Sequence, residues 1–373
     1  MAKLEFIEIE EEQDESEEDQ TGPFNPKDID IGVEQRSLDS IFARLEHGEI
    51  DLNTEFQREG NLWPAATMSR LIESVMVRFP LPAFYFDAGD DDRWLVVDGL
   101  QRLCTFKRFV VDCETPGIEP LKLVGLEFLK NYNGLIFSDL PYNMQRRIRE
   151  SQITAYFIKP GTPLEVKYSI FYRINTGGLI LNAQEIRHAL NQKGYASQFL
   201  KAVSEEPVFK NIVSISSKRM QDRELILRHM AFRLHPYQTY KPAMKHFLNT
   251  AIKELSLRPM EELDRWKNQF LSSLEASECI FGKHAFSKSI ADPRRNPTLN
   301  RGLFEVMTVV LAEMPDERKE LLVSQKEKFL EAFKALLNDT EFSNSITSAT
   351  TGSAAVKERF DRIKQLFSTY TRK

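Results

Sequence analysis

The stretch LPAFYFDAGDDDRWLVVDGLQR, residues 81–102, decides the fold. Two runs rich in aromatic and β-branched residues, 81–86 and 93–97, flank a turn-forming cluster at 88–92, so the sequence predicts a β-hairpin. Apolar residues at helical spacing follow the second run directly. We therefore expect a strand, a tight turn at 98–99 and a helix in immediate succession.

Helices and strands are also predicted on both sides of this stretch. Helical patterns occupy 37–48, 64–79, 140–149, 164–174 and 182–194, and extended patterns occupy 50–56 and 153–158. Asn182 and Glu185 have the spacing of a capping box at the start of the last of these helices.

Strand patterns disappear after residue 195. Helical periodicity recurs at 196–203, 222–235, 241–256, 259–276, 300–313, 317–338 and 354–369, and a polar loop is expected at 343–353. We therefore predict the α+β fold class, with a mixed N-terminal domain at 28–195 and an all-helical C-terminal domain at 196–373.

The acidic N-terminus differs in composition from the rest of the chain. The net charge is −5, the first 20 residues account for −9, and the other residues therefore carry +4. Blocks of like charge with few apolar residues are typical of disordered segments. We expect residues 1–27 to form an acidic disordered tail, which either keeps the protein soluble or competes with nucleic acid for the basic remainder.

Composition and motifs exclude several classes of protein. The chain has 373 residues, of which 42% are hydrophobic and 28% charged, as in ordinary globular proteins. No apolar run reaches about 18 residues, so we expect no membrane-spanning helix and no membrane partner. The acidic N-terminus is unlike a secretory signal and indicates a cytoplasmic protein. The three cysteines, the six histidines and the glycine pattern match no zinc, P-loop, dinucleotide or esterase motif.

The candidate site with the clearest chemistry is Asp98-Gly99-Leu100-Gln101-Arg102, between a strand and a helix. Backbone N–H groups at the start of a helix attract anions, and a glycine there allows a ligand to approach closely. Arg102 could bind a phosphate, Gln101 adds a donor, and Asp98 could hold Mg²⁺. Alternatively, Asp-Gly simply makes a tight turn and Arg102 forms a surface ion pair.

Two further segments are candidates of the same kind. Arg58 follows an extended segment and could reach a shared pocket, although it could equally be a solvated charge. Asn175, Thr176 and Gly177 end a helix and could bind a base, a sugar or a metal-bound water; they could also form only a helix C-cap. Basic and aromatic residues between 218 and 301 would form a phosphate-binding surface if they shared one side of the fold.

Several motifs in this order resemble the N-terminal domain of GmrSD-type restriction endonucleases. They are FQR at 56–58, SRLIES at 69–74, PLP at 80–82, DGLQR at 98–102, FYRINTGG at 171–178 and LNAQEIR at 181–187. The resemblance covers roughly residues 35–195 and implies a fold similar to ParB and sulfiredoxin. It also implies a role in restriction and defence against phage or foreign DNA, with DNA as a partner.

The resemblance implies that Asp98, Gln101 and Arg102 bind and hydrolyse a nucleoside triphosphate (NTP) with Mg²⁺ held by Asp98. Gly99, Arg58, Asn175, Thr176 and Gly177 would contact the nucleotide. On this interpretation, Arg102→Ala abolishes turnover in a protein that stays folded. Leu100 stands where the family usually has Gln. The chain shows no HNH nuclease pattern, so either a separate nuclease subunit supplies cleavage or the protein does not cut.

Three functions are therefore open at this point. The first is an NTP-hydrolysing regulator or sensor that acts on DNA. The second is a DNA-binding nucleotide switch without appreciable hydrolysis, and the third is a metal-dependent nuclease. The nucleotide, the DNA feature, the partner and the formation of a homo-oligomer are not specified by the sequence.

Overall fold

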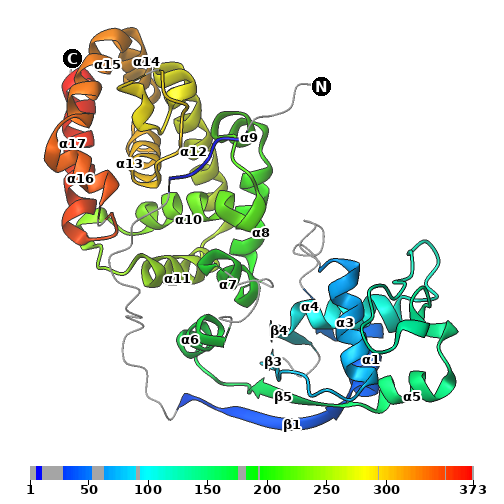
Figure 1. Cartoon of the computed structure of the whole chain (residues 1–373). Coiled ribbons are helices and arrows are strands. Elements are labelled where there is room, and N and C mark those ends of the chain that lie inside the picture. Colours follow the sequence, from blue (N-terminus) through cyan, green and yellow to red (C-terminus); the bar gives the residue numbers. More distant parts are fainter. Residues whose placement is uncertain are drawn as a thin grey trace. The chain divides into compact units, whose positions relative to one another are not determined.

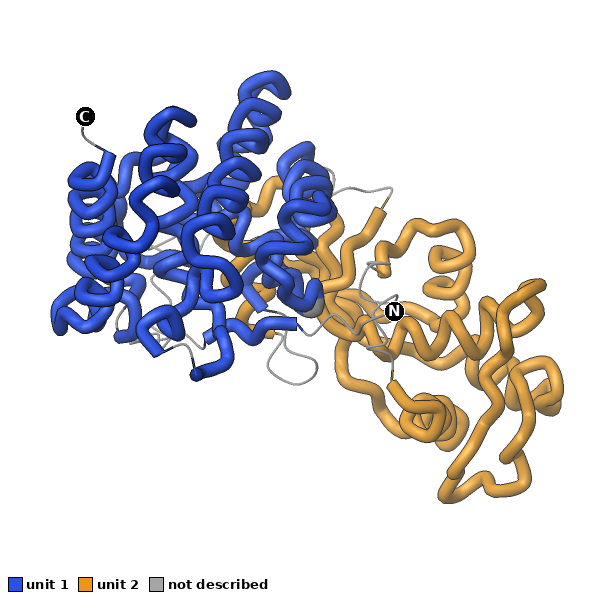
Figure 2. Tube along the Cα trace, turned by 90° about the horizontal axis from the view of Figure 1, so that it is seen from above, with its two compact units in different colours: residues 1–20, 182–373 blue, residues 21–181 orange. Residues whose placement is uncertain are grey.

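The computed structural model describes residues 6–10, 28–52, 63–89, 93–174, 182–191, 194–292, 294–348 and 350–371. The chain divides into two compact units, one formed by residues 21–181 and the other by 1–20 together with 182–373 (Figure 2). The division falls at 181–182, so the helix that begins after Asn182 lies in the same compact unit as the helices that follow it.

The unit of residues 21–181 is a mixed α/β structure around one sheet (Figure 1). Its elements are β1 (Ile31–Ser37), α1 (Leu38–Glu46), β2 (Ile50–Asp51), α3 (Ala65–Met76), β3 (Phe84–Asp87), β4 (Trp94–Asp98), α4 (Leu100–Phe106) with a π-helical turn at Lys107–Val111, α5 (Tyr142–Glu150), β5 (Gln152–Ile158) and α6 (Leu164–Ile174). The strand order is β1-β5-β3-β4-β2. β3 pairs antiparallel with β4, as the predicted hairpin requires, and parallel with β5.

The two faces of the sheet differ in their side chains. Phe86, Trp94 and Phe157 contact one another on the face that forms the core with α1, α3 and α4. Tyr85 and Tyr156 stack on the other face, at 4.8 Å between ring centroids. Because strand side chains alternate between faces, the sequence order Phe84-Tyr85-Phe86 places one tyrosine opposite two buried phenylalanines.

Helix α3 holds the irregular segment after α4 through two buried polar side chains. Ser69 Oγ accepts a hydrogen bond from Val124 N at 2.9 Å. The Glu73 carboxylate, only 3% exposed, accepts from the backbone N–H groups of residues 127, 128 and 129 at 2.8–2.9 Å. A carboxylate with three such donors replaces the backbone partners that this segment lacks.

Helices α1 and α3 end in the same way with different residues. In each, the residue after the C-cap has a left-handed backbone and closes a Schellman motif: Gly48 at φ +68° and Arg78 at φ +66°. Glycine adopts this conformation freely, whereas arginine pays about 1–2 kcal/mol for it. The end of α3 therefore carries a residue that the backbone disfavours.

The second unit consists of helices. They are α7 (Ala183–Leu190), α8 (Tyr195–Glu205), α9 (Pro207–Val213), α10 (Gln221–Leu234), α11 (Met244–Leu255), α12 (Met260–Phe281), α13 (Arg301–Ala312), α14 (Asp316–Ser324), α15 (Lys326–Leu337), α16 (Thr340–Thr347) and α17 (Ser353–Thr371). Helix α13 is buried on almost every side. Its fully buried Glu305 pairs with Arg228 of α10 and Arg359 of α17, so each buried charge has a partner.

Part of the acidic N-terminus packs against this helical unit. Ile9 forms a parallel bridge with Leu299, and Ile7 and Ile9 contact the core. Glu10 forms an ion pair with Lys288 at 2.8 Å and accepts a hydrogen bond from Asn300 at 2.8 Å. The sequence predicted disorder for residues 1–27; residues 6–10 instead pack on the helical unit, because Ile7 and Ile9 contact its core and the Glu10 carboxylate finds partners there.

One strand was not predicted from the sequence, and two predictions about local structure were wrong. Residues 31–37 form the edge strand β1, which the sequence hides because most of its side chains are exposed. Residues 340–347 form α16, capped by Asp339 and buried at Phe342 and Ile346, where part of the predicted polar loop lies. Residues 317–338 form two helices rather than one. In the part of the chain that the structure describes, no helix is both long enough and apolar enough to cross a bilayer.

We expect the stability of the α/β unit to depend on the charge of Glu73. Burial raises the pKa of this carboxyl group, but the hydrogen bonds from Leu129, Glu127 and Phe128 and the charge of Arg70 outweigh it, so its pKa lies below the usual value. The folded state therefore gains stability above the unfolded pKa of about 4.3, and this gain disappears as the pH falls through the lower folded value.

The measurement compares Glu73→Gln with the wild type by urea unfolding at neutral and acidic pH. The variant is expected to lose about 2–3 kcal/mol at pH 7 and to approach the wild type as the pH falls below about 4. Glu127→Gln, which changes a 59% exposed carboxylate in the same segment, is the control and should have little effect. A pH-independent difference for Glu73→Gln would contradict this account.

A second prediction concerns the left-handed residue Arg78. Arg78→Gly relieves about 1–2 kcal/mol of backbone strain in the folded state. It also makes the unfolded chain more flexible, which lowers stability by about 0.4–1 kcal/mol, so we expect the free energy of unfolding to rise by about 0.5–1 kcal/mol. Gly48→Ala, at the same position of α1, should lose stability. Urea unfolding followed by tryptophan fluorescence in a Trp266→Phe background reports on the α/β unit, which retains Trp63 and Trp94. A less stable Arg78→Gly would show that strain is not the dominant effect.

Candidate functional site

The turn between β4 and α4 is built as the sequence predicted, and its glycine has a packing reason. Gly99 is the N-cap of α4 with φ +99°, a conformation that side chains rarely adopt. A Cβ at this position would lie 2.5 Å from the Phe84 ring and 3.3 Å from the Arg102 guanidinium. The chain therefore needs glycine here because β3 and Arg102 approach closely, whether or not a ligand does.

Arg102 points into the domain. Its side chain is 10% exposed and lies over the Phe84 ring at 4.2 Å. Its guanidinium donates hydrogen bonds to the carbonyl oxygens of Pro82 and Ala83 and to Asp98 Oδ2, the last at 2.8 Å. Burial lowers the pKa of Arg102 and the Asp98 charge opposes this shift. The group remains protonated, as arginines in proteins do.

These contacts change the role that the sequence assigned to Arg102. The prediction was that its guanidinium binds a phosphate, or forms only a surface ion pair. In the structure it joins the start of α4 to the segment before β3 and fixes one oxygen of Asp98. We therefore interpret Arg102 as a positioning residue.

Asp98 and Gln101 remain at the accessible side of the turn. The Asp98 side chain is 33% exposed at the end of β4. Gln101 Oε1 accepts a hydrogen bond from Trp63 N at 3.1 Å, which fixes the start of the segment that leads into α3. Leu100 packs partly against the core and offers no hydrogen-bonding group. Asp98 is thus the group of this motif best placed to meet a cation or a water.

The structure also brings together residues that the sequence did not single out. Tyr85 pairs with Asp98 across β3 and β4, and its ring stacks on that of Tyr156 with an angle of 10° between the planes. Burial raises the pKa of the Tyr85 hydroxyl, and the charges of Tyr156 and Asp98 add to this shift. The alternation of strand residues was the only signal that could have found this half-buried pair.

The other predicted site residues lie outside the described residues. Arg58 belongs to 53–62, and Asn175, Thr176 and Gly177 belong to 175–181, so their place near Asp98 stays a prediction. Among the described residues, no group of three or more His, Cys, Asp and Glu side chains could hold a metal ion. A Mg²⁺ ion that reaches the protein with triphosphate oxygens needs only one or two carboxylates, and Asp98 fits that requirement.

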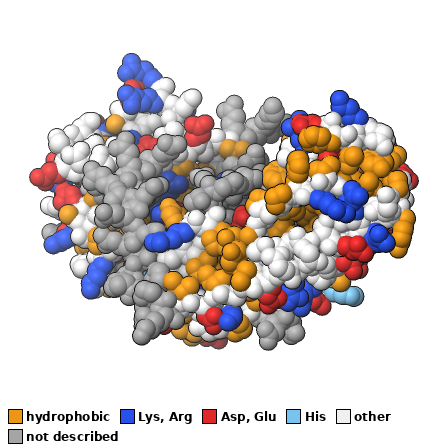
Figure 3. Space-filling model, turned by 60° about the horizontal axis from the view of Figure 1, so that its bottom comes forward, with side chains coloured by type: hydrophobic (Ala, Val, Ile, Leu, Met, Phe, Trp, Pro, Cys, Tyr) orange, Lys and Arg blue, Asp and Glu red, His pale blue; other side chains and the backbone are white. Residues whose placement is uncertain are grey.

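Several basic residues of the helical unit are paired with acidic groups of the fold. Arg228 is buried against Glu224 and Glu305, and Arg301 binds Glu224 and the Glu10 carbonyl. Arg294 and Arg295 both pair with Asp292. On the face of the described residues in Figure 3, Lys and Arg side chains are scattered among acidic and apolar ones.

Arg102→Ala is now expected to destabilise the protein rather than leave it folded and inactive. It removes three hydrogen bonds from a charged donor and a cation–π contact, and we expect a loss of about 3 kcal/mol. Arg44→Ala is a matched control. Arg44 also lies over a ring, Trp94 at 3.9 Å, and pairs with a carboxylate, Glu49, but it binds no carbonyl of a distant segment among the described residues. Urea unfolding of both variants tests this; equal losses would contradict the role of the carbonyl contacts.

Comparison with known proteins agrees with the resemblance seen in the sequence. A family model described as the GmrSD restriction endonuclease N-terminal domain matches residues 38–191. Searches of the curated proteins and of the solved structures found no match, so the likeness to ParB and sulfiredoxin stays a prediction. The matched segment contains β2, α3, the hairpin of β3 and β4, and the turn of Asp98. Residues 38–191 are therefore similar to the GmrSD restriction endonuclease N-terminal domain family, and this similarity suggests a role related to restriction and defence.

Proposed function

We propose that the α/β unit binds a nucleoside triphosphate with Mg²⁺ at the turn between β4 and α4, and that the bound nucleotide regulates an action on DNA in defence against foreign DNA. The observation that carries this proposal is the state of Asp98. Its carboxylate lies partly exposed at a strand end, and one of its oxygens is fixed by a buried arginine that is itself anchored to the backbone.

Such an arrangement supports metal binding better than a free surface aspartate does. A carboxylate that is held in place loses little conformational entropy when it binds a cation, and the fixed oxygen leaves the other oriented. The Tyr85–Tyr156 pair beside it offers half-buried aromatic faces on the same side of the sheet. A nucleotide base could stack there while the phosphates and Mg²⁺ meet Asp98.

The contacts to the phosphates are the part of the proposal that depends on the sequence alone. Gly99, Gln101, Arg58, Asn175, Thr176 and Gly177 are the residues proposed for them. Arg102 contributes by holding Asp98 and the segment before β3, and not by touching the nucleotide.

Leu100 favours a second candidate function, a DNA-binding nucleotide switch without appreciable hydrolysis. Its side chain packs partly against the core where the family usually has a Gln, so the turn has one hydrogen-bonding group fewer for a water or a phosphate. Binding and hydrolysis therefore need separate measurements.

The test of the proposal uses calorimetric titration of the full chain with each of the four ribonucleoside triphosphates, with and without Mg²⁺. Asp98→Asn keeps an acceptor for Arg102 but removes the charge, and it is expected to weaken Mg²⁺–NTP binding at least about tenfold. Asp39→Asn is the matched control, since Asp39 also pairs with an arginine, Arg149, at 2.9 Å. If the wild type binds none of the nucleotides, or if Asp98→Asn binds them equally well, the proposal fails.

Phosphate release measured on the same samples separates the two functions. Turnover that is lost in Asp98→Asn supports the NTP-hydrolysing regulator. Binding without turnover supports the switch.

A further inference from the structure

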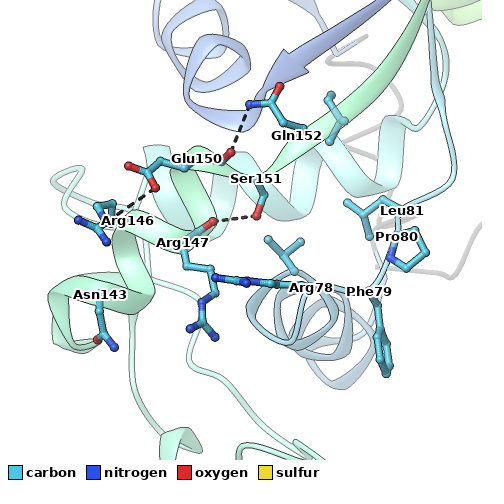
Figure 4. A pocket seen from close by; sticks show the side chains of 12 residues that line it. Arg78, Phe79, Pro80, Leu81, Asn143, Arg146, Arg147, Glu150, Ser151 and Gln152 are labelled. Carbon is cyan, nitrogen blue, oxygen red and sulfur yellow. Dashed lines mark hydrogen bonds and ion pairs between the residues drawn. The ribbon is translucent and has the colours of Figure 1, made fainter.

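A polar pocket of about 440 Å³ lies away from the Asp98 turn in the α/β unit. One side is formed by the end of α3 and residues 78–81, and the other by α5 and the first residues of β5 (Figure 4). The pocket uses none of the residues proposed for nucleotide binding.

The charge of this pocket is positive. Its lining contains three arginines, Arg78, Arg146 and Arg147, against one carboxylate, Glu150. Arg146 lies 3.7 Å from Glu150 in an exposed ion pair, which is worth little in water. In Figure 4 the side chain of Arg78 extends toward that of Arg147. Guanidinium groups that approach each other favour an anion between them.

Part of this charge has an explanation within the fold. Arg147 Nη1 donates to the carbonyl oxygen of Met76 at 2.9 Å, so it satisfies the C-terminal end of α3, where a cation is favourable. Arg78 is different: its guanidinium makes no hydrogen bond or ion pair with any residue that the structure describes. It also occupies the left-handed position that glycine would fill more easily. No described contact of the fold uses this guanidinium, whereas a bound phosphate would gain a charged hydrogen-bond donor from it.

Two exposed aromatic side chains adjoin the arginines. Phe79, which lines the pocket, is 53% exposed, and Phe128 is 64% exposed. Their rings meet edge to face at 5.9 Å. Exposed rings next to cations are the arrangement with which proteins hold single-stranded nucleic acid, because bases stack on the rings and phosphates meet the cations. The rings are too open to enclose a free nucleotide, but they suit a strand that continues past them.

We propose that this pocket binds the backbone of single-stranded nucleic acid, with a phosphate between Arg78, Arg146 and Arg147 and an unpaired base on Phe79 and Phe128. The proposal deepens the inferred action on DNA, and it does not require nucleotide binding at Asp98.

The experiment measures fluorescence anisotropy of a labelled oligothymidylate of about 20 nucleotides with the full chain at several salt concentrations. Arg78→Gly is the decisive variant, because it removes the unpaired guanidinium and is expected to melt no lower than the wild type. Its affinity should fall at least about fivefold, and the slope of log affinity against log salt should fall by about 0.7. Arg318→Gln, at an exposed position of α14, is the control for loss of one positive charge and should leave the affinity unchanged.

The base contact is tested by Phe128→Ser. This variant should have a lower affinity for the single strand and an unchanged affinity for a duplex of the same sequence. Thymidine monophosphate and inorganic phosphate serve as competitors that distinguish a strand from a free anion. Equal affinity of Arg78→Gly and wild type would overturn the proposal, as would displacement of the strand by the monomer at comparable concentration. Nucleotide titration of Arg78→Gly should match the wild type, so failure here is distinguishable from failure at Asp98.

Discussion

The α/β unit depends on one guanidinium group. Arg102 projects from the first turn of α4 and ties Asp98 at the end of β4 to the carbonyls of Pro82 and Ala83 before β3. It can do so only because Gly99 has no side chain and the Phe84 ring lies against the turn. The hairpin, the helix that follows it and the exposed carboxylate therefore share one constraint. Pro80 and Leu81, on the same short segment, also line the pocket that contains Arg78, Arg146 and Arg147.

The hairpin and the turn could be predicted because their signals are local. Aromatic runs, a Gly-Asp cluster and an Asp-Gly before helical spacing are visible in one stretch of sequence. The capping box of Asn182 and Glu185 is local in the same sense, and the structure confirms it. The partners of Arg102 could not be predicted, because they are backbone carbonyls and carry no residue type. The three backbone donors of Glu73 were hidden for the same reason.

Charged residues were the most misleading part of the sequence. The arginines between 218 and 301 suggested a basic surface, but several of them pair with acids that lie far away in the chain, as Arg219 does with Glu185 and Arg228 with Glu305. The sequence did not predict a site at the arginines of α5, because their proximity to Arg78 depends on how α3 ends. A helix that ends without glycine also lacks the usual sequence signal of a left-handed cap. Periodicity predicts where helices lie, and it says little about which charges meet.

The docked residues 6–10 bear on how the chain can be shortened. The acidic composition of the first 27 residues invites their removal for biophysical work. Such a shortened chain would leave Leu299 without its bridge partner, expose apolar surface that Ile7 and Ile9 now cover, and remove the carboxylate that pairs with Lys288. Aggregation of a trimmed protein would then reflect this newly exposed apolar surface, and its behaviour would say nothing about the fold of the remaining residues.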